Sequence, residues 1–196
     1  MDFEATKKLY TVFRQLEDFD QSDLDLAKKF IHFNAYQPKD YIFCQGDFPP
    51  EIHFVIDGIG RYFYIDHDGN ERNKSLVRIG GAFASVSTVV DGSPSPFYTQ
   101  ALTPCLTASI TYKNLLYLAD NHRSWGIFLR RLYERLVIKK EQREASFLML
   151  SAKERYLAFL QEFEQDSHQI PLRHIAMYLG ITDVTLSRIR REMGLT

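Results

Sequence analysis

The last stretch of the chain, residues 171–196, carries side chains that could recognise a nucleic acid. After Thr182, apolar residues recur at helical spacing on one side, at Leu186 and Ile189, and polar or basic residues fill the other. On that polar side, Arg188 can donate two parallel hydrogen bonds to guanine, and Val184 can contact a thymine methyl group. The residues expected to meet DNA are Thr182, Val184, Thr185, Ser187, Arg188 and Arg191.

Two short helical patterns surround Gly180 in this stretch. Ile175, Ala176 and Leu179 form the apolar face of the first pattern, and glycine ends it because glycine adopts the left-handed conformation without strain. Thr182 is a suitable N-cap for the second pattern. This spacing predicts a helix-turn-helix whose second helix enters the major groove. The alternative interpretation is an ordinary pair of helices with a solvated basic face.

The composition is that of a soluble globular protein, with 196 residues, 45% hydrophobic residues and 25% charged residues. Because the formal net charge is only -1, a DNA-binding protein of this composition must concentrate its basic charge locally. From Pro171 onward four arginines oppose two acidic residues. The charge pattern therefore favours DNA contact at this end.

Neither a metal site nor an enzyme active site is indicated. Cys44 and Cys105 stand far apart and are expected to be buried thiols, so we expect no zinc site, no iron–sulfur cluster and no cofactor. A cupin-like metal site needs clustered histidines, whereas His32, His53 and His67 are isolated. The N-terminus lacks a signal-peptide core and no apolar run reaches about 18 residues, so we expect a cytoplasmic protein without membrane contact.

The elements that position these residues begin with helices. Residues 2–33 have helical spacing, with Ser22 as the expected cap of a second helix. From Asn34 the apolar period becomes two, which is typical of strands. Strands are expected near 35–37, 41–44, 52–57, 60–66, 72–79, 97–103 and 105–110. Short strands at this spacing predict an antiparallel roll of the jelly-roll kind, interrupted between Phe83 and Phe97, and the fold class is α+β.

A short helix over 112–121 and a long one over about 124–150 follow the roll. Trp125, Leu129, Leu132 and Leu136 are spaced by three and four residues, which is typical of a coiled-coil seam and predicts a homodimer. The alternative is a helix that packs only on its own roll. A capping box at Ser151–Glu154 then begins a new helix.

The order of roll, long helix and C-terminal helix pair resembles the CRP/FNR family of bacterial transcription regulators. The likeness is most specific over Leu172–Met193, and Arg155 looks like the arginine that opens the family's DNA-binding domain. Residues 80–86 resemble the entry to the family's phosphate-binding cassette. The resemblance implies a cyclic-nucleotide-binding-like roll at 1–122, a dimerisation helix at 123–150 and a DNA-binding domain at 151–196. It also implies double-stranded DNA and RNA polymerase as partners of a homodimer.

The cassette departs from the family pattern where the ligand would bind. Ser85 and Val86 stand where glycine and glutamate belong, and Ser95 and Pro96 stand where arginine and serine belong. Because residues 80–104 contain no arginine or lysine, we expect no cyclic AMP binding. An unknown small-molecule effector is expected to contact Phe83, Ser85, Val86, Ser87 and Tyr98.

The recognition helix also differs from the family pattern. Asp183, Val184 and Thr185 stand where the family often has arginine, glutamate and threonine, so a different DNA sequence is expected. We expect the family's wing hairpin to be missing after the recognition helix, since the sequence stops at Thr196. The sequence predicts a homodimeric, sequence-specific transcription regulator. The competing hypothesis is a ligand-binding roll whose helix pair contacts protein.

Overall fold

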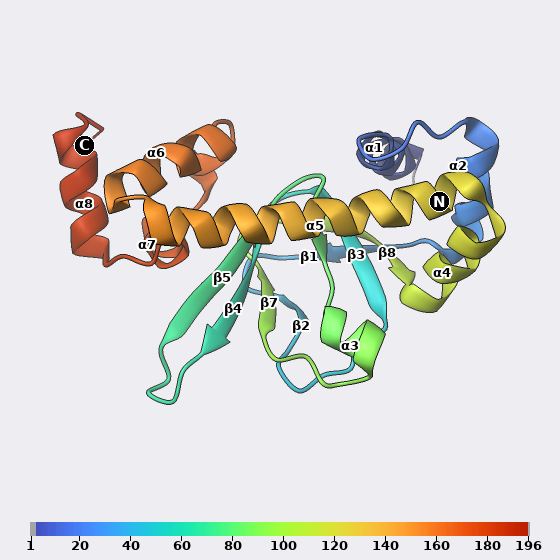
Figure 1. Ribbon diagram of the computed structural model, residues 1–196, viewed down its shortest axis with the longest axis horizontal. Helices are drawn as coiled ribbons and strands as arrows, with labels where there is room; N and C mark the ends of the chain where they lie inside the picture. Colours follow the sequence, from blue (N-terminus) through green and yellow to red (C-terminus); the bar gives the residue numbers. More distant parts are fainter. Residues whose placement is uncertain (1–2, 196) are drawn as a thin grey trace. The chain divides into compact units, whose positions relative to one another are not determined.

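The computed structural model describes residues 3–195, and Figure 1 follows the elements along the chain. The first elements are α1 (Phe3–Arg14), α2 (Gln21–Ala27) and a 3-10 turn, η1 (Lys28–Phe30). Helical structure ends at Phe30 rather than at residue 33, because β1 begins at His32. The predicted cap Ser22 is wrong, since Asp20 Oδ1 accepts from the Asp23 backbone nitrogen at 2.8 Å and from the Ser22 hydroxyl at 2.8 Å.

The strands form two four-stranded sheets, ordered β1-β8-β3-β6 and β2-β7-β4-β5. The paired strands β1–β8, β3–β8, β3–β6 and β2–β7 are antiparallel, which confirms the predicted antiparallel α+β fold. The two-residue strand β6 was not predicted, because two residues are too few to show a period. The strands are β1 (His32–Tyr36), β2 (Tyr41–Phe43), β3 (Glu51–Asp57), β4 (Gly60–Ile65), β5 (Glu71–Val77), β6 (Ala82–Phe83), β7 (Tyr98–Ala101) and β8 (Cys105–Thr111).

Strand β3 is buried on both faces, which explains its continuous apolar run. Ile52, Phe54 and Ile56 pack with the helices in one core cluster, whereas Val55 belongs to the cluster that contains Phe83. A strand between two apolar layers loses the alternating pattern that a half-exposed strand shows.

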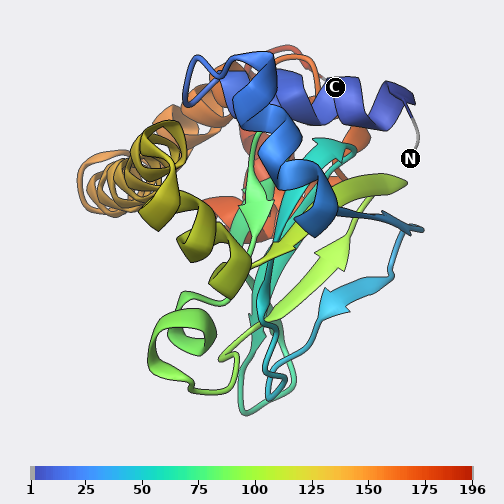
Figure 2. The same ribbon diagram turned by 90° about the vertical axis from the view of Figure 1, so that its right-hand side faces the viewer.

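The remaining helices are α3 (Val86–Asp91), α4 (Tyr112–Asn121), α5 (Arg123–Met149), α6 (Ala152–Glu162), α7 (Leu172–Leu179) and α8 (Asp183–Glu192), with a 3-10 turn η2 (Ser167–Gln169) before α7. Ser151 and Glu154 form the predicted capping box of α6. Helices α3 and α4 lie on the same side of the roll (Figure 2).

The chain divides into two compact units. The first contains the residues up to Tyr62 together with Leu76–Leu136, and the second contains Phe63–Ser75 together with the residues from Val137 onward. The division therefore falls inside α5 and assigns the β4–β5 hairpin to the C-terminal unit, unlike the predicted boundaries at 122 and 150. Residues 1, 2 and 196, which the predicted domains include, lie outside the described residues.

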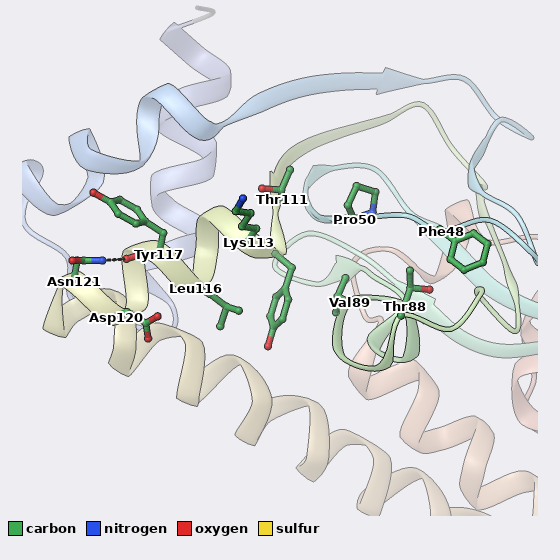
Figure 3. Close-up of a pocket in the computed structure, with 12 residues that line it drawn as sticks. Phe48, Pro50, Thr88, Val89, Thr111, Lys113, Leu116, Tyr117, Asp120 and Asn121 are labelled. Atoms are coloured by element: carbon green, nitrogen blue, oxygen red, sulfur yellow. Dashed lines mark hydrogen bonds between the residues drawn. The ribbon is translucent and has the colours of Figure 1, made fainter.

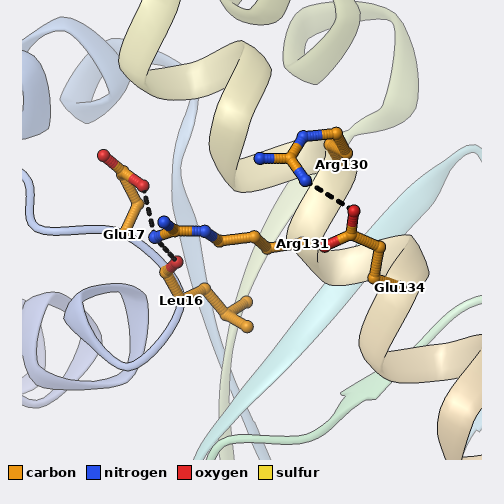
Figure 4. A network of polar contacts seen from close by, with 5 residues as sticks. All are labelled: Leu16, Glu17, Arg130, Arg131 and Glu134. Atoms are coloured by element: carbon orange, nitrogen blue, oxygen red, sulfur yellow. Dashed lines mark hydrogen bonds and ion pairs between the residues drawn. The ribbon is translucent and has the colours of Figure 1, made fainter.

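The first half of α5 is fixed to the N-terminal helices. Trp125 is fully buried, and its Nε1 donates to the Asp23 carbonyl at 3.0 Å. Arg131 donates to the Leu16 carbonyl at 2.7 Å and pairs with Glu17 at 2.6 Å (Figure 4). These contacts hold this half of the helix within its own unit.

This packing corrects the predicted dimer seam. Trp125 lies inside its own core, and Leu129 and Leu132 pack against the same cluster. Of the four seam residues only Leu136 is exposed. The first half of α5 therefore follows the alternative interpretation, in which the helix packs on its own unit.

Candidate nucleic-acid interface

Helices α7 and α8 are joined by a tight turn at Gly180. The Gly180 nitrogen donates to Met177 O at 3.2 Å, and the Ile181 nitrogen donates to Ala176 O at 3.0 Å. These two bonds form a Schellman motif, which requires the left-handed conformation that Gly180 adopts at φ 67°. A side chain at Gly180 would also collide with Phe147, whose Cε1 lies 2.9 Å from the ideal Cβ position. The predicted role of Gly180 is confirmed.

Two arginines donate hydrogen bonds to carbonyls at the end of α7 that the two backbone bonds of the turn do not use. Arg143 Nη2 donates to Tyr178 O at 3.0 Å, and Arg155 Nε donates to Leu179 O at 3.1 Å. Arg155 Nη1 also donates to Leu150 O at 2.7 Å. Arg155 was predicted from its likeness to the family's arginine, whereas the role of Arg143 was not predicted, because Arg143 precedes α7 by about 30 residues and lies within a polar stretch of α5.

Helix α8 buries one face and exposes the other. The hydroxyl of Thr182 accepts from the Thr185 backbone nitrogen at 3.2 Å and so caps the helix as predicted. Leu186 and Ile189 are buried, whereas Val184 is 80% exposed. Ser187, Arg188 and Arg191 are also exposed, and the Thr185 hydroxyl lies 2.9 Å from the Thr182 hydroxyl. The structure thus brings the predicted DNA-contacting residues together on one helix.

The arginines of α8 differ in their environment. Arg190 turns inward, where Nη1 donates to the Tyr156 hydroxyl at 2.7 Å and Nη2 donates to Leu195 O at 3.0 Å. Within residues 3–195, the guanidinium groups of Arg188 and Arg191 have no hydrogen bond or ion pair to another residue. The basic charge that remains available for an anionic partner therefore comes from these two residues and from the exposed Arg173.

In the roll, the five residues predicted to hold an effector differ in burial and surroundings. Phe83 is fully buried in the interior cluster, and the Ser85 hydroxyl accepts from Thr88 Oγ1 at 2.8 Å and lies 3.2 Å from Ser87 Oγ. Tyr98 lies beside Tyr41, with 6.1 Å between ring centroids. It points away from the interior, because its neighbour Thr99 is the residue that faces inward. Val86 is exposed.

The roll interior next to the cassette contains Tyr62. Its hydroxyl accepts from the Ala84 nitrogen at 2.7 Å and lies 3.0 Å from Ala82 O, to which it can donate. Its ring lies 5.3 Å from Phe83 and 5.1 Å from Phe97. Burial raises the pKa of Tyr62, so the hydroxyl stays protonated at physiological pH. The Tyr62 hydroxyl therefore forms hydrogen bonds with backbone groups of Ala82 and Ala84 at the cassette entry.

A cavity of about 680 Å³ lies between α3 and α4 (Figure 3). Its walls combine apolar side chains with one lysine and one aspartate. Thr88 and Val89 of α3 face Leu116 of α4 across it (Figure 3). This cavity was not predicted from the sequence, because its lining comes from three separate segments of the chain. The lining residues are Phe48, Pro50, Thr88, Val89, Gly92, Thr111, Tyr112, Lys113, Leu116, Tyr117, Asp120 and Asn121.

Among residues 3–195 no group of three or more histidine, cysteine, aspartate or glutamate side chains could hold a metal ion. In the same part of the chain, every helix is too short or too polar to cross a lipid bilayer.

Comparison with known proteins agrees with the two-sheet roll. Residues 33–122 match the family model of the cyclic nucleotide-binding domain. This match covers the strands from β1 to β8 and helix α4. No curated protein matches the chain in sequence.

Solved structures share the fold of the two-sheet roll and of the elements that follow it. The regulator CLP of Xanthomonas campestris is 14% identical, with a TM-score of 0.70 over 89% of this chain and 92% of CLP. FixK2 of Bradyrhizobium japonicum is 18% identical, with a TM-score of 0.65 over 84% of each chain. The catabolite activator protein of Thermus thermophilus is 21% identical, with a TM-score of 0.56 over 90% of this chain and 84% of that protein. These structural neighbours are CRP/FNR-type regulators.

Proposed function

We propose that this protein is a homodimeric, sequence-specific DNA-binding transcription regulator of the CRP/FNR type that does not respond to cyclic AMP. The observation that carries the proposal is the exposed face of α8, where Arg188 and Arg191 are unpaired within the described chain. Helix α8 begins at a capped N-terminus and is joined to α7 by the three residues Gly180, Ile181 and Thr182, a turn length typical of a helix-turn-helix. Phosphate groups would neutralise the free guanidinium groups, and a base edge would be within reach of Arg188.

The second half of α5 supplies the proposed dimer contact. Val137, Ile138, Leu148 and Met149 are 60%, 53%, 75% and 79% exposed. Val137 and Leu148 are three helical turns apart and so lie on one face. Glu141 and Glu144 lie between them on that face, so the apolar surface consists of two exposed patches, at 137–138 and 148–149, which the same face of a second copy would cover.

Insensitivity to cyclic AMP follows from two features of the roll. The cassette region 80–104 contains no cationic side chain to hold a cyclic phosphate. Tyr62 already bonds the backbone of Ala82 and Ala84 at the cassette entry. CLP is described as a c-di-GMP responsive regulator, so ligand response in this fold is not confined to cyclic AMP. The cavity between α3 and α4 could hold an effector of this protein. RNA polymerase is a further proposed partner.

The proposal is tested by selecting sites from random DNA with the purified full chain and measuring affinity at several salt concentrations. Selection of one near-palindromic site, with affinity falling steeply as salt rises, is the expected result. The competing hypothesis, a roll whose helix pair contacts only protein, predicts no enriched sequence. That outcome would overturn the proposed function.

A further inference from the structure

The β4–β5 hairpin is bonded to the first helix of the pair through Asn73. This residue is 5% exposed, and its side-chain Nδ2 donates to the His174 carbonyl of α7 at 3.0 Å. The backbone carbonyl of Asn73 lies 3.5 Å from Arg143 Nη2. One residue of the hairpin therefore contacts both α7 and the second half of α5.

Arg143 is held in place by its neighbours. Its guanidinium carbon lies 4.2 Å from the Tyr178 ring centroid and 4.7 Å from the Phe147 ring centroid. Such placement over aromatic faces orients a guanidinium group and favours its charge. The same group donates to Tyr178 O at 3.0 Å, so it binds both the ring and the carbonyl of Tyr178.

These contacts fix α7 at two points along its length. His174 lies in the first turn of α7, and Tyr178 lies in the last turn. Helix α8 follows after only Gly180, Ile181 and Thr182, so a change in the orientation of α7 moves α8 with it.

We infer that Asn73 and Arg143 are positioning residues, which set the orientation of α7 and thereby of α8 on DNA. The claim that α8 is oriented on DNA rests on the proposed function. The claim that the two residues set the orientation of α7 does not. Neither side chain is expected to touch DNA. Strands β4 and β5 continue from the hairpin into the roll, so the hairpin is a covalent route by which the roll can affect the helix pair.

The test uses the full chain and three variants. Asn73→Asp keeps the shape of the side chain but removes the donor to His174 O. Arg143→Lys keeps the charge but cannot reproduce the planar fork. Arg72→Ala is the matched control, because this hairpin neighbour has a side chain that is 71% exposed and pairs with Asp66.

Two measurements separate positioning from simple destabilisation. Hydrogen exchange of the α7 amides in the free protein should be faster in Asn73→Asp and Arg143→Lys than in the wild type and Arg72→Ala. Affinity for the selected DNA site should fall about tenfold in both variants. A fall of this size corresponds to the loss of one buried hydrogen bond. Affinity for random DNA and its salt slope should stay unchanged, because Arg188 and Arg191 are intact.

Wild-type exchange of α7 in both variants would overturn the inference. Faster exchange with unchanged affinity for the selected site would also overturn it, because α7 would then be loosened without consequence for α8. If the wild type binds no DNA specifically, the proposed function fails, and α7 exchange alone still decides whether Asn73 and Arg143 hold the helix. If Asn73→Asp unfolds, Asn73→Ser takes its place, and its α7 amides should exchange faster than those of the wild type, because the shorter side chain does not reproduce the bond from Asn73 Nδ2 to the His174 carbonyl.

Discussion

The Tyr62 hydroxyl oxygen lies 2.7 Å from the backbone nitrogen of Ala84, the residue that precedes Ser85 of the cassette. In the same interior, the ring of Tyr62 packs beside Phe83 and Phe97. The polar backbone groups at the cassette entry thus have an internal partner in place of a ligand.

The first prediction is that calorimetry detects no cyclic AMP binding to the wild type or to Tyr62→Phe. Removing the hydroxyl leaves the Ala84 N–H without its partner and supplies no cation for a phosphate, so only stability changes. Tyr62→Phe should lower the free energy of unfolding by about 1–3 kcal/mol. Tyr64→Phe, at a site 39% exposed, is the control and should change it little. A dissociation constant of about a micromolar for either protein would contradict the prediction.

Local signals sufficed to predict most elements of the fold. Gly180, Thr182 and the Ser151–Glu154 capping box mark helix ends through interactions within a few residues, and all three are present as predicted. A period of two is visible in strands such as β7, whereas β3 is buried on both faces and lacks it. Strand β6 and the cap at Asp20 were missed, because two residues carry no period and two neighbouring polar residues compete for one cap.

The site was less predictable because contacts distant in sequence decide it. Trp125 has the spacing of a dimer seam, and only the positions of Phe13 and Phe19 reveal that it is buried within its own unit. Arg190 belongs by sequence to a basic helix face, and only Tyr156, on another helix, reveals that it points inward. For Tyr98 the sequence was informative by itself. Strand alternation places the Tyr98 side chain on the opposite face from its buried neighbours Phe97 and Thr99.

The second prediction concerns pH. Burial lowers the pKa of His53 from 6.5 to about 4, and its Nδ1 lies 3.5 Å from the Thr107 hydroxyl. Because the unfolded chain binds a proton at higher pH than the folded chain, this contribution to stability is complete above about pH 6.5 and is lost as pH falls towards 4. Between pH 7 and pH 5 the loss should be about 2 kcal/mol.

Chemical denaturation at both pH values checks this. His53→Gln should remove most of the difference between them, whereas His67→Gln, in the exposed hairpin, should leave it as in the wild type. Equal pH dependence in His53→Gln and the wild type would show that other groups cause the loss.

The third prediction concerns self-association. The wild type should sediment as a dimer at micromolar concentration, and Leu148→Glu should shift it towards monomer because a further charge enters an exposed apolar patch. Leu132→Glu should instead lower the melting temperature, since Leu132 packs against its own core. Lys140→Gln, at an exposed position on another side of the same helix, is the control. A monomeric wild type would rule out the dimer.

The fourth prediction concerns Arg190. Tyr156 is fully buried and its hydroxyl accepts from Arg190 Nη1, so Tyr156→Phe leaves a half-buried guanidinium without that partner. The variant should lower the free energy of unfolding by about 1–3 kcal/mol. DNA base preference, measured on the molecules that remain folded, should not change. A changed preference would mean that Arg190 reads DNA.

The last prediction concerns Arg188 and Arg191, which are exposed on α8 one turn apart. Arg188 lies more than one turn into α8, where a guanidinium group can form two parallel bonds to one guanine, and Arg191 lies where it should meet a phosphate. Arg188→Ala should therefore cost about 1–3 kcal/mol per half-site and relax the preference at one base pair. Arg191→Ala should weaken binding to all sequences alike and reduce the salt slope by about one.

The melting temperature and the base preference are measured on the same samples. Loss of a structural arginine lowers the melting temperature, whereas loss of a base-reading arginine changes the base preference. The guanidinium of Arg188 has no bond to another described residue, so Arg188→Ala should leave the melting temperature unchanged, and Arg188→Lys should restore charge but not base preference. A lower melting temperature with unchanged base preference would assign Arg188 to the structure of its own unit. Unequal effects of Arg191→Ala on different sequences would instead move the base contact one turn along α8.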